Sequence, residues 1–67
     1  MEDKAQKRTE ALDIYMLKEE IETLEDLCEN IDISKATLWK FRSGEKVSRK
    51  TIIKISKKIG VEATELY

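Results

Sequence analysis

The feature that most limits how this chain can fold is the segment ISKATLWKFRSGEKVS, which has the pattern of a short helix closed by a glycine. Ser34 is a residue type that caps helix N-termini, and Gly44 can take the left-handed conformation that often ends a helix. Between them, Leu38 and Phe41 are three positions apart and form one apolar side. We therefore predict a helix over about 34–43.

A second short helix precedes this segment. Thr23 followed by Asp26 approximates a capping box, because the threonine hydroxyl can accept from an N–H of the first turn and the carboxylate suits a helix start. Leu27 and Ile31 then fall on one apolar side. We predict a helix over about 23–30 that a tight turn joins to the next one.

An N-terminal helix is predicted before these two. It runs from about Glu10 to Glu20. Its apolar face holds Ile14, Leu17 and Ile21 at helical spacing. The polar residues 1–9 before it are expected to form a flexible segment.

The C-terminal part continues the helical pattern. Ser48 can cap a helix that Gly60 ends, and residues 62–67 add a further helical turn or two. The chain is thus predicted to be an all-α domain of four to five helices over residues 10–67. In the helix after Ser48, we expect Ile52, Ile55 and Ile59 to face the core and Lys50, Lys54, Lys57 and Lys58 to face solvent.

Length and composition limit the function. A chain of 67 residues builds one small core, since this size buries only about 60% of the unfolded surface. Pro is absent, which favours helices. The N-terminus lacks the apolar run of a signal peptide and no membrane span occurs, so we expect a cytoplasmic protein. Without His, a phosphate-binding loop or clustered ligands, we expect no enzyme, cofactor, metal or small-molecule substrate, and Cys28 is interpreted as structural.

Charge is distributed unevenly along the chain. Residues 1–33 carry 4 basic and 11 acidic residues, a net charge of −7, whereas residues 34–67 carry 9 basic and 3 acidic residues, a net charge of +6. Because a local basic face sets the attraction to phosphates, the second half can bind nucleic acid although the whole chain has a net charge of −1. Simple solvation of a small helical surface is the alternative explanation.

One continuous register of residues runs through the last four predicted helices. Its members are Leu27, Cys28, Ile31-Asp32-Ile33-Ser34, Thr37-Leu38, Phe41, Ser43-Gly44, Ile52-Ile53-Lys54-Ile55, Ile59-Gly60-Val61 and Leu66. In this register residues 23–67 resemble the Cro and phage-repressor helix-turn-helix family, also called XRE-type. The resemblance implies a compact DNA-binding domain and, as function, a sequence-specific transcriptional regulator, which we expect to be a phage or mobile-element repressor of Cro type.

Three features depart from the pattern of that family. Asp32 stands where the family has Gly in the turn, and it can take the left-handed conformation at some cost. Leu24 replaces a Gln that commonly binds phosphate, so that only the helix N-terminus remains there. Arg42 and Lys18 occupy the positions of a Glu–Arg ion pair, which two basic residues cannot form. Arg42 is instead expected to turn toward DNA or to pair with Glu19, Glu20 or Glu22.

The resemblance makes the helix over about 34–43 the recognition helix. A major groove accepts a helix and shows a distinct pattern for each base pair, so Lys35 and Lys40 can donate to guanine and Ala36 can touch a thymine methyl. Trp39 can pack on a thymine methyl or a sugar; alternatively it faces a protein partner or lies partly in the core. The candidate base contacts are Lys35, Ala36, Trp39 and Lys40.

Phosphate contacts are expected at the starts of the paired helices and just after the recognition helix. Such contacts position a protein on DNA and make its affinity depend on salt. The candidates are Thr23, Leu24, Ser34, Ser43, Lys46, Ser48, Arg49 and Lys50.

The expected partner is a double-stranded DNA operator. Two-fold operators require two recognition helices, so we expect a homodimer, formed in solution or only on DNA. Val61, Leu66 and Tyr67 lie at the end of the chain where many relatives dimerise. The alternative function is a protein-interaction module of the same fold, such as an antirepressor, an antitoxin or an adaptor.

Overall fold

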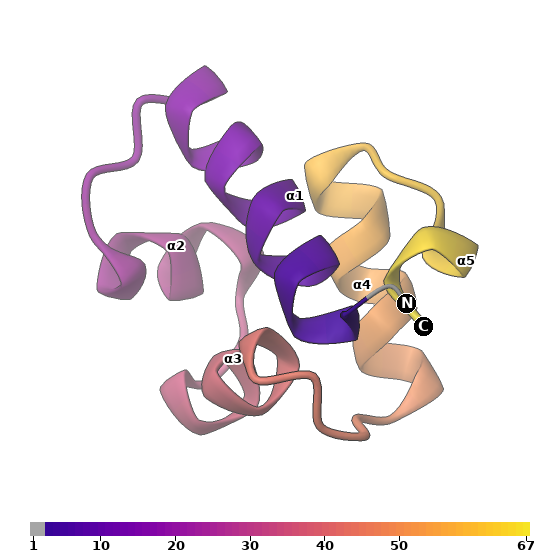
Figure 1. The fold of residues 1–67 in the computed structure, drawn as a ribbon. Helices are drawn as coiled ribbons and strands as arrows, with labels where there is room; N and C mark the ends of the chain where they lie inside the picture. The colour runs from indigo at the N-terminus through magenta and orange to yellow at the C-terminus, as the bar shows by residue number, and fades with distance from the viewer. Residues whose placement is uncertain (1–2) are drawn as a thin grey trace.

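Five α-helices pack around one core in the computed structural model, which describes residues 3–67 (Figure 1). The first helix packs on the last three, and the second packs on the third and fourth. The described residues contain no strand, which confirms the predicted all-α class. In chain order the helices are α1 (Lys4–Lys18), α2 (Leu24–Ile31), α3 (Lys35–Arg42), α4 (Arg49–Ile59) and α5 (Ala63–Leu66).

Every helix supplies side chains to the core. Those predicted from α2, α3 and α4 are buried as expected, except that Ile59 is only partly buried at its edge. The lysines predicted on the outer side of α4 are exposed. The buried apolar residues are Leu12, Tyr15, Leu27, Cys28, Ile31, Leu38, Phe41, Ile52, Ile55 and Leu66.

The helix starts follow from local capping chemistry. The hydroxyls of Thr23, Ser34 and Ser48 each accept a hydrogen bond from a backbone N–H in the first turn of α2, α3 and α4. Such caps satisfy donors that a helix start leaves without a partner. Gly60 ends α4 with φ of 76°, in the left-handed conformation predicted for it. These four boundaries confirm the sequence predictions.

The N-terminal helix differs from its prediction. It begins at Lys4 and not at Glu10, because Asp3 caps it by accepting a hydrogen bond from the backbone N–H of Ala5. Residues 4–9 of the segment expected to be flexible are therefore helical, while residues 1 and 2 of that prediction lie outside the described residues.

The inward face of α1 also differs from the prediction. Ile14 and Leu17 are 67% and 83% exposed, so the prediction is wrong for these two residues. Ile21, the third predicted member, lies beyond the end of α1 and is partly buried against the core. The buried residues are Arg8, Leu12 and Tyr15, which share one helical face. Because one of these three inward residues is an arginine, the spacing of apolar residues alone does not identify the inner face.

Buried Arg8 connects α1 to the ends of α3 and α5. The side chain is only 2% exposed. Its Nε donates to the Leu66 carbonyl at 2.7 Å, and one terminal nitrogen donates to the carbonyls of Phe41 and Glu45 at 3.0 and 2.9 Å. The guanidinium carbon also lies 4.6 Å from the centre of the Phe41 ring. Arg8 thus holds together chain segments that are far apart in the sequence.

The first turn of α1 presses against the turn that follows α3. Gly44 has φ of 82°, as predicted, and a Cβ placed there would lie 3.1 Å from the backbone nitrogen of Ala5. The Thr9 hydroxyl donates to the carbonyl of Arg42 at 3.4 Å. The C-terminal end of α3 is therefore fixed by α1.

Within residues 3–67, no helix combines the length and the apolar character needed to cross a bilayer. The same part of the chain brings together no group of three or more His, Cys, Asp or Glu side chains suited to a metal ion.

Candidate nucleic-acid interface

A tight turn sets the angle between α2 and α3. Asp32 takes the left-handed conformation, with φ of 65° and ψ of 53°, as the sequence predicted. Its N–H and that of Ile33 both donate to the Cys28 carbonyl, at 2.8 and 3.1 Å. Lys54 of α4 donates to the Asp32 carbonyl at 2.7 Å, a contact that the sequence did not predict. The turn is thus tied to the core helices on both sides.

The two sides of α3 have different environments. Leu38 and Phe41 are buried, which confirms the predicted inner side. The four candidate base contacts are all exposed, so α3 presents them to solvent as one surface. Trp39 is 59% exposed and is therefore not a core residue of this chain. Lys35 and Trp39 line one hollow beside α3, Lys40 lines a second, and Ala36 lines neither.

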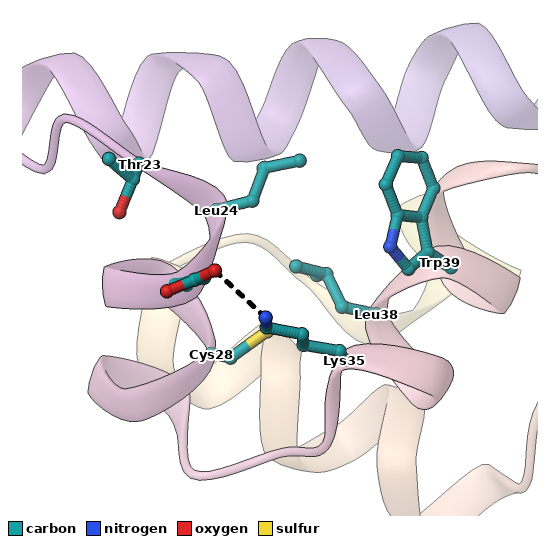
Figure 2. A pocket seen from close by; sticks show the side chains of 7 residues that line it. Thr23, Leu24, Cys28, Lys35, Leu38 and Trp39 are labelled. Carbon is teal, nitrogen blue, oxygen red and sulfur yellow. Dashed lines mark hydrogen bonds and ion pairs between the residues drawn. The ribbon is translucent and has the colours of Figure 1, made fainter.

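The first hollow lies between α2 and α3, and we call it the α2–α3 hollow. Figure 2 shows Leu38 between Leu24 of α2 and Trp39 of α3. Cys28 lies in its wall, and burial raises the pKa of this thiol, which keeps it protonated and a poor nucleophile. The lining residues are Thr23, Leu24, Glu25, Cys28, Lys35, Leu38 and Trp39.

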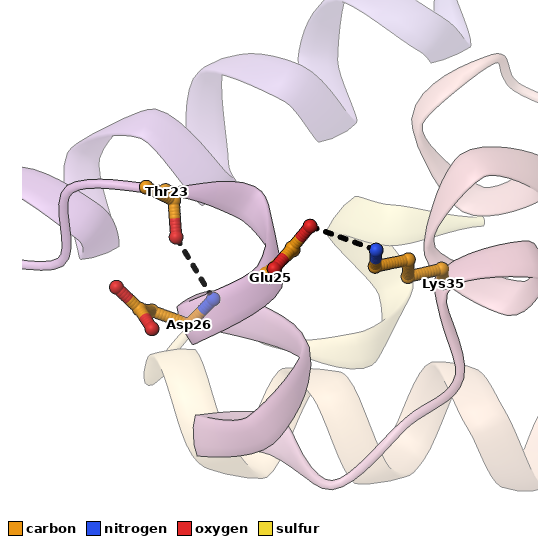
Figure 3. A network of polar contacts seen from close by, with 4 residues as sticks. All are labelled: Thr23, Glu25, Asp26 and Lys35. Carbon is orange, nitrogen blue, oxygen red and sulfur yellow. Dashed lines mark hydrogen bonds and ion pairs between the residues drawn. The ribbon is translucent and has the colours of Figure 1, made fainter.

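An ion pair spans the α2–α3 hollow. Lys35 Nζ lies 2.8 Å from Glu25 Oε1, and Figure 3 shows this contact beside the Thr23 cap of α2. The hydrogen bond and the opposite charge lower the pKa of the Glu25 carboxyl and raise that of the Lys35 ammonium. Both groups are therefore ionised at neutral pH. Sequence reasoning identified Lys35 but missed its acidic partner.

Arg42 does not form the ion pair that was one of its two predicted roles. Its guanidinium carbon lies 5.4 Å from the centre of the Trp39 ring, a cation–π contact. Within residues 3–67, Arg42 forms no ion pair with Glu19, Glu20 or Glu22, and its Nε is buried without a hydrogen-bond partner. Arg42 therefore supports the Trp39 ring from its own helix.

The second hollow lies between α3 and the start of α4, and we call it the α3–α4 hollow. It brings Lys40 from α3 together with Lys46 and Ser48 from the following segment. The N-terminus of α4 adds the positive end of the helix dipole. Two lysines beside a helix N-terminus are suited to bind a phosphate group. The lining residues are Thr37, Lys40, Lys46, Val47, Ser48 and Thr51.

The candidate phosphate contacts fall into two groups. Lys46, Arg49 and Lys50 are exposed cations beside the α3–α4 hollow. The hydroxyls of Thr23, Ser34 and Ser48 serve as caps, and the Ser43 hydroxyl can donate to the Lys40 carbonyl or the Glu45 carboxylate. Leu24 is partly buried against the core. The cations are therefore the groups best placed to meet a polyanion.

The family described as Cro/C1-type HTH DNA-binding domain matches residues 11–67, which include α2 to α5 and α1 from Ala11 onward. No curated protein and no solved structure matches the chain significantly.

Proposed function

Because this chain belongs to the Cro/C1-type helix-turn-helix DNA-binding family, we propose that it is a sequence-specific repressor of a phage or another mobile element. Family membership makes it a DNA-binding regulator in general terms. The position of α3 is the observation that supports sequence-specific DNA binding most directly. This helix exposes Lys35, Ala36, Trp39 and Lys40 while its other side is packed in the core.

In the proposed complex α3 enters the major groove. A groove about 12 Å wide admits a helix, and its base edges distinguish all four base pairs. Lys40 donates to guanine O6 and N7, and Ala36 lets the helix approach closely or touches a thymine methyl. Trp39 packs its ring on a thymine methyl or a sugar, with Arg42 behind the ring.

Phosphates on one flank are bound near the start of α4. Lys40 and Lys46 line the α3–α4 hollow, and Arg49 and Lys50 belong to the exposed first turn of α4. These cations orient the domain on the duplex without reading its sequence. Glu45 lies in the same loop and accepts from Ser43, so its carboxylate limits how closely a phosphate can approach there.

Salt dependence tests DNA binding. Operators are first selected from random duplex DNA with the full chain, and affinity is then measured by fluorescence anisotropy at several salt concentrations. We expect log affinity to fall linearly with log salt, with a slope of about −0.9 for each phosphate contacted. Weak and nearly salt-independent binding to every duplex would count against a DNA-binding function.

Assembly as a homodimer on DNA forms part of the proposal, although the predicted interface needs a correction. Leu66 is only 1% exposed, so its side chain serves mainly the core of its own chain. An apolar hollow between α1 and α5 contains Val61 beside Ile14, which is exposed. We propose this surface as the contact between two copies, since removing the exposed isoleucine side chain from water would stabilise the dimer.

Sedimentation with a duplex of two half-sites tests the dimer. We expect two chains per duplex, and Ile14→Glu is expected to reduce cooperative binding because it places a carboxylate in the contact. Leu17→Glu is the matched control, since Leu17 is exposed on the same helix but does not line the hollow. A strict one-to-one complex with this duplex would refute the homodimer.

A protein-interaction module is the second candidate function. Ile14 and Leu17 expose large apolar side chains on the acidic first half of the chain, which favours contact with another protein. An interaction module would bind a protein while showing no selected operator in the experiment above.

A further inference from the structure

The ion pair between Glu25 and Lys35 places a carboxylate beside the candidate base contacts. It joins the first turn of α2 to the first turn of α3, with 2.8 Å between the charged atoms. The side chains of Lys35 and Glu25 are 63% and 73% exposed, so neither is fixed by burial. Both line the α2–α3 hollow, whose other wall carries Trp39. Any molecule that touches Lys35 on this surface therefore competes with Glu25.

We propose that Glu25 is a specificity-determining residue, because it holds Lys35 away from backbone phosphates and so keeps the affinity for unrelated DNA low. This inference rests on the proposed function, since it assumes that α3 faces DNA. Glu25 acts through Lys35 and is therefore a positioning residue. Glu25 lowers the affinity for those duplexes whose bases offer Lys35 no good acceptor.

The Glu25–Lys35 ion pair is weak enough for a good base contact to replace it. Exposed ion pairs contribute little to stability, so a base contact that offers two acceptors can replace this one at small cost. A phosphate gives Lys35 another bond to an anion in place of its 2.8 Å bond to the Glu25 carboxylate, so the exchange brings little gain. Unrelated DNA, which offers mainly phosphates, is therefore penalised relative to an operator.

The surroundings of the pair keep it in place. The carboxylate of Glu25 belongs to the first turn of α2, where the helix dipole favours negative charge. Asp26, its neighbour in that turn, uses its backbone N–H for the Thr23 cap. The other residues that line the hollow carry no carboxylate: Thr23, Leu24, Cys28, Leu38 and Trp39. Glu25 is thus the anionic partner that this surface offers to Lys35.

The Glu25→Gln variant tests the inference. Its affinity for a duplex of unrelated sequence is expected to rise about two- to fivefold, the range that corresponds to an exposed ion pair. Its salt slope is expected to steepen by about 0.9 per bound chain, because Lys35 can then contact one phosphate more. The affinity for the selected operator should change less, so the ratio of specific to unrelated binding falls.

Glu62→Gln is the matched control. It changes the net charge equally, and Glu62 precedes α5, where its side chain makes no capping bond. This control is expected to leave the salt slope unchanged. An equal gain in both variants would show a general charge effect and would overturn the inference.

A double variant separates positioning from direct repulsion of DNA by the carboxylate. If Glu25 acts through Lys35, the gain of Glu25→Gln disappears when Lys35→Met is added, and the steeper slope disappears with it. A gain that persists without Lys35, or no gain in Glu25→Gln, would overturn the inference. Failure of the parent protein to bind any duplex would instead refute the proposed function, so the two failures are distinguishable.

Discussion

Replacing Arg8 with methionine is expected to lower the free energy of unfolding by at least about 3 kcal/mol. Three backbone carbonyls, those of Phe41, Glu45 and Leu66, lose their side-chain donor, although the Phe41 carbonyl keeps the backbone N–H of Gly44. Leaving a buried acceptor without a partner costs roughly 1–3 kcal/mol, and the loss of the packed guanidinium adds to this cost. A domain of 67 residues has only about 3–10 kcal/mol of stability in total. The variant should therefore be largely or wholly unfolded, as measured by urea denaturation followed by circular dichroism.

Arg49→Met is the control for that experiment. It removes the same side chain from an exposed position at the start of α4, and surface substitutions usually change stability by less than about 0.5 kcal/mol. Arg8→Lys keeps the charge but loses the planar fork that reaches three carbonyls, so we expect an intermediate loss. Equal stability of Arg8→Met and Arg49→Met would show that the buried hydrogen bonds contribute nothing.

Replacing Lys40 with alanine is expected to weaken operator binding by roughly 1–3 kcal/mol, about fivefold to 150-fold, and to relax the preference at one base position. The fold should survive, because Lys40 is exposed on α3 and alanine is a good helix former. Isothermal titration with the selected operator and with operators altered at single positions measures both effects.

Lys58→Ala is the matched control for Lys40→Ala. Lys58 is equally exposed but lies in the last turn of α4, outside both hollows that flank α3. We expect its loss to have a small effect that is the same for all DNA sequences. If the two variants bound the operator and its altered forms alike, α3 would not be the element that reads bases.

The elements whose boundaries carry local chemistry were predicted well. Ser34, Ser48 and Gly60 act within one helical turn of their own positions, so adjacent residues suffice to identify them. The core side of α4 was also evident, because its isoleucines repeat at helical spacing. The same reasons explain why α2, α3 and the turn between them could be placed from the sequence.

The first helix could not be predicted in the same way, because its inner face depends on distant backbone atoms. Arginine is a residue type that usually lies at the surface, and the acceptors of Arg8 lie 33 to 58 positions away in the sequence. No pattern within α1 shows that those carbonyls will meet a guanidinium. The family match covers residues 11–67, and it therefore does not include Arg8 either.

The sequence identified the individual residues of the candidate site, but it did not show which of them lie together. Lys35, Trp39 and Lys40 were identified as one surface, whereas the structure divides them between the two hollows. Glu25 lies ten positions before Lys35, with a turn between them, so helical spacing does not connect the two. The contact of Arg42 with Trp39 was missed because the family comparison directed attention to acidic partners.

The bond from Arg8 to the Leu66 carbonyl has a consequence for the order in which the molecule folds. It joins residues 58 positions apart and so closes almost the whole chain into a ring. Closure of a long loop is entropically costly until the elements between its ends have condensed. Short helices and their turns can form early, whereas this link can form only when both ends have reached the same place. Arg8 is therefore expected to lower the unfolding rate more than it raises the folding rate.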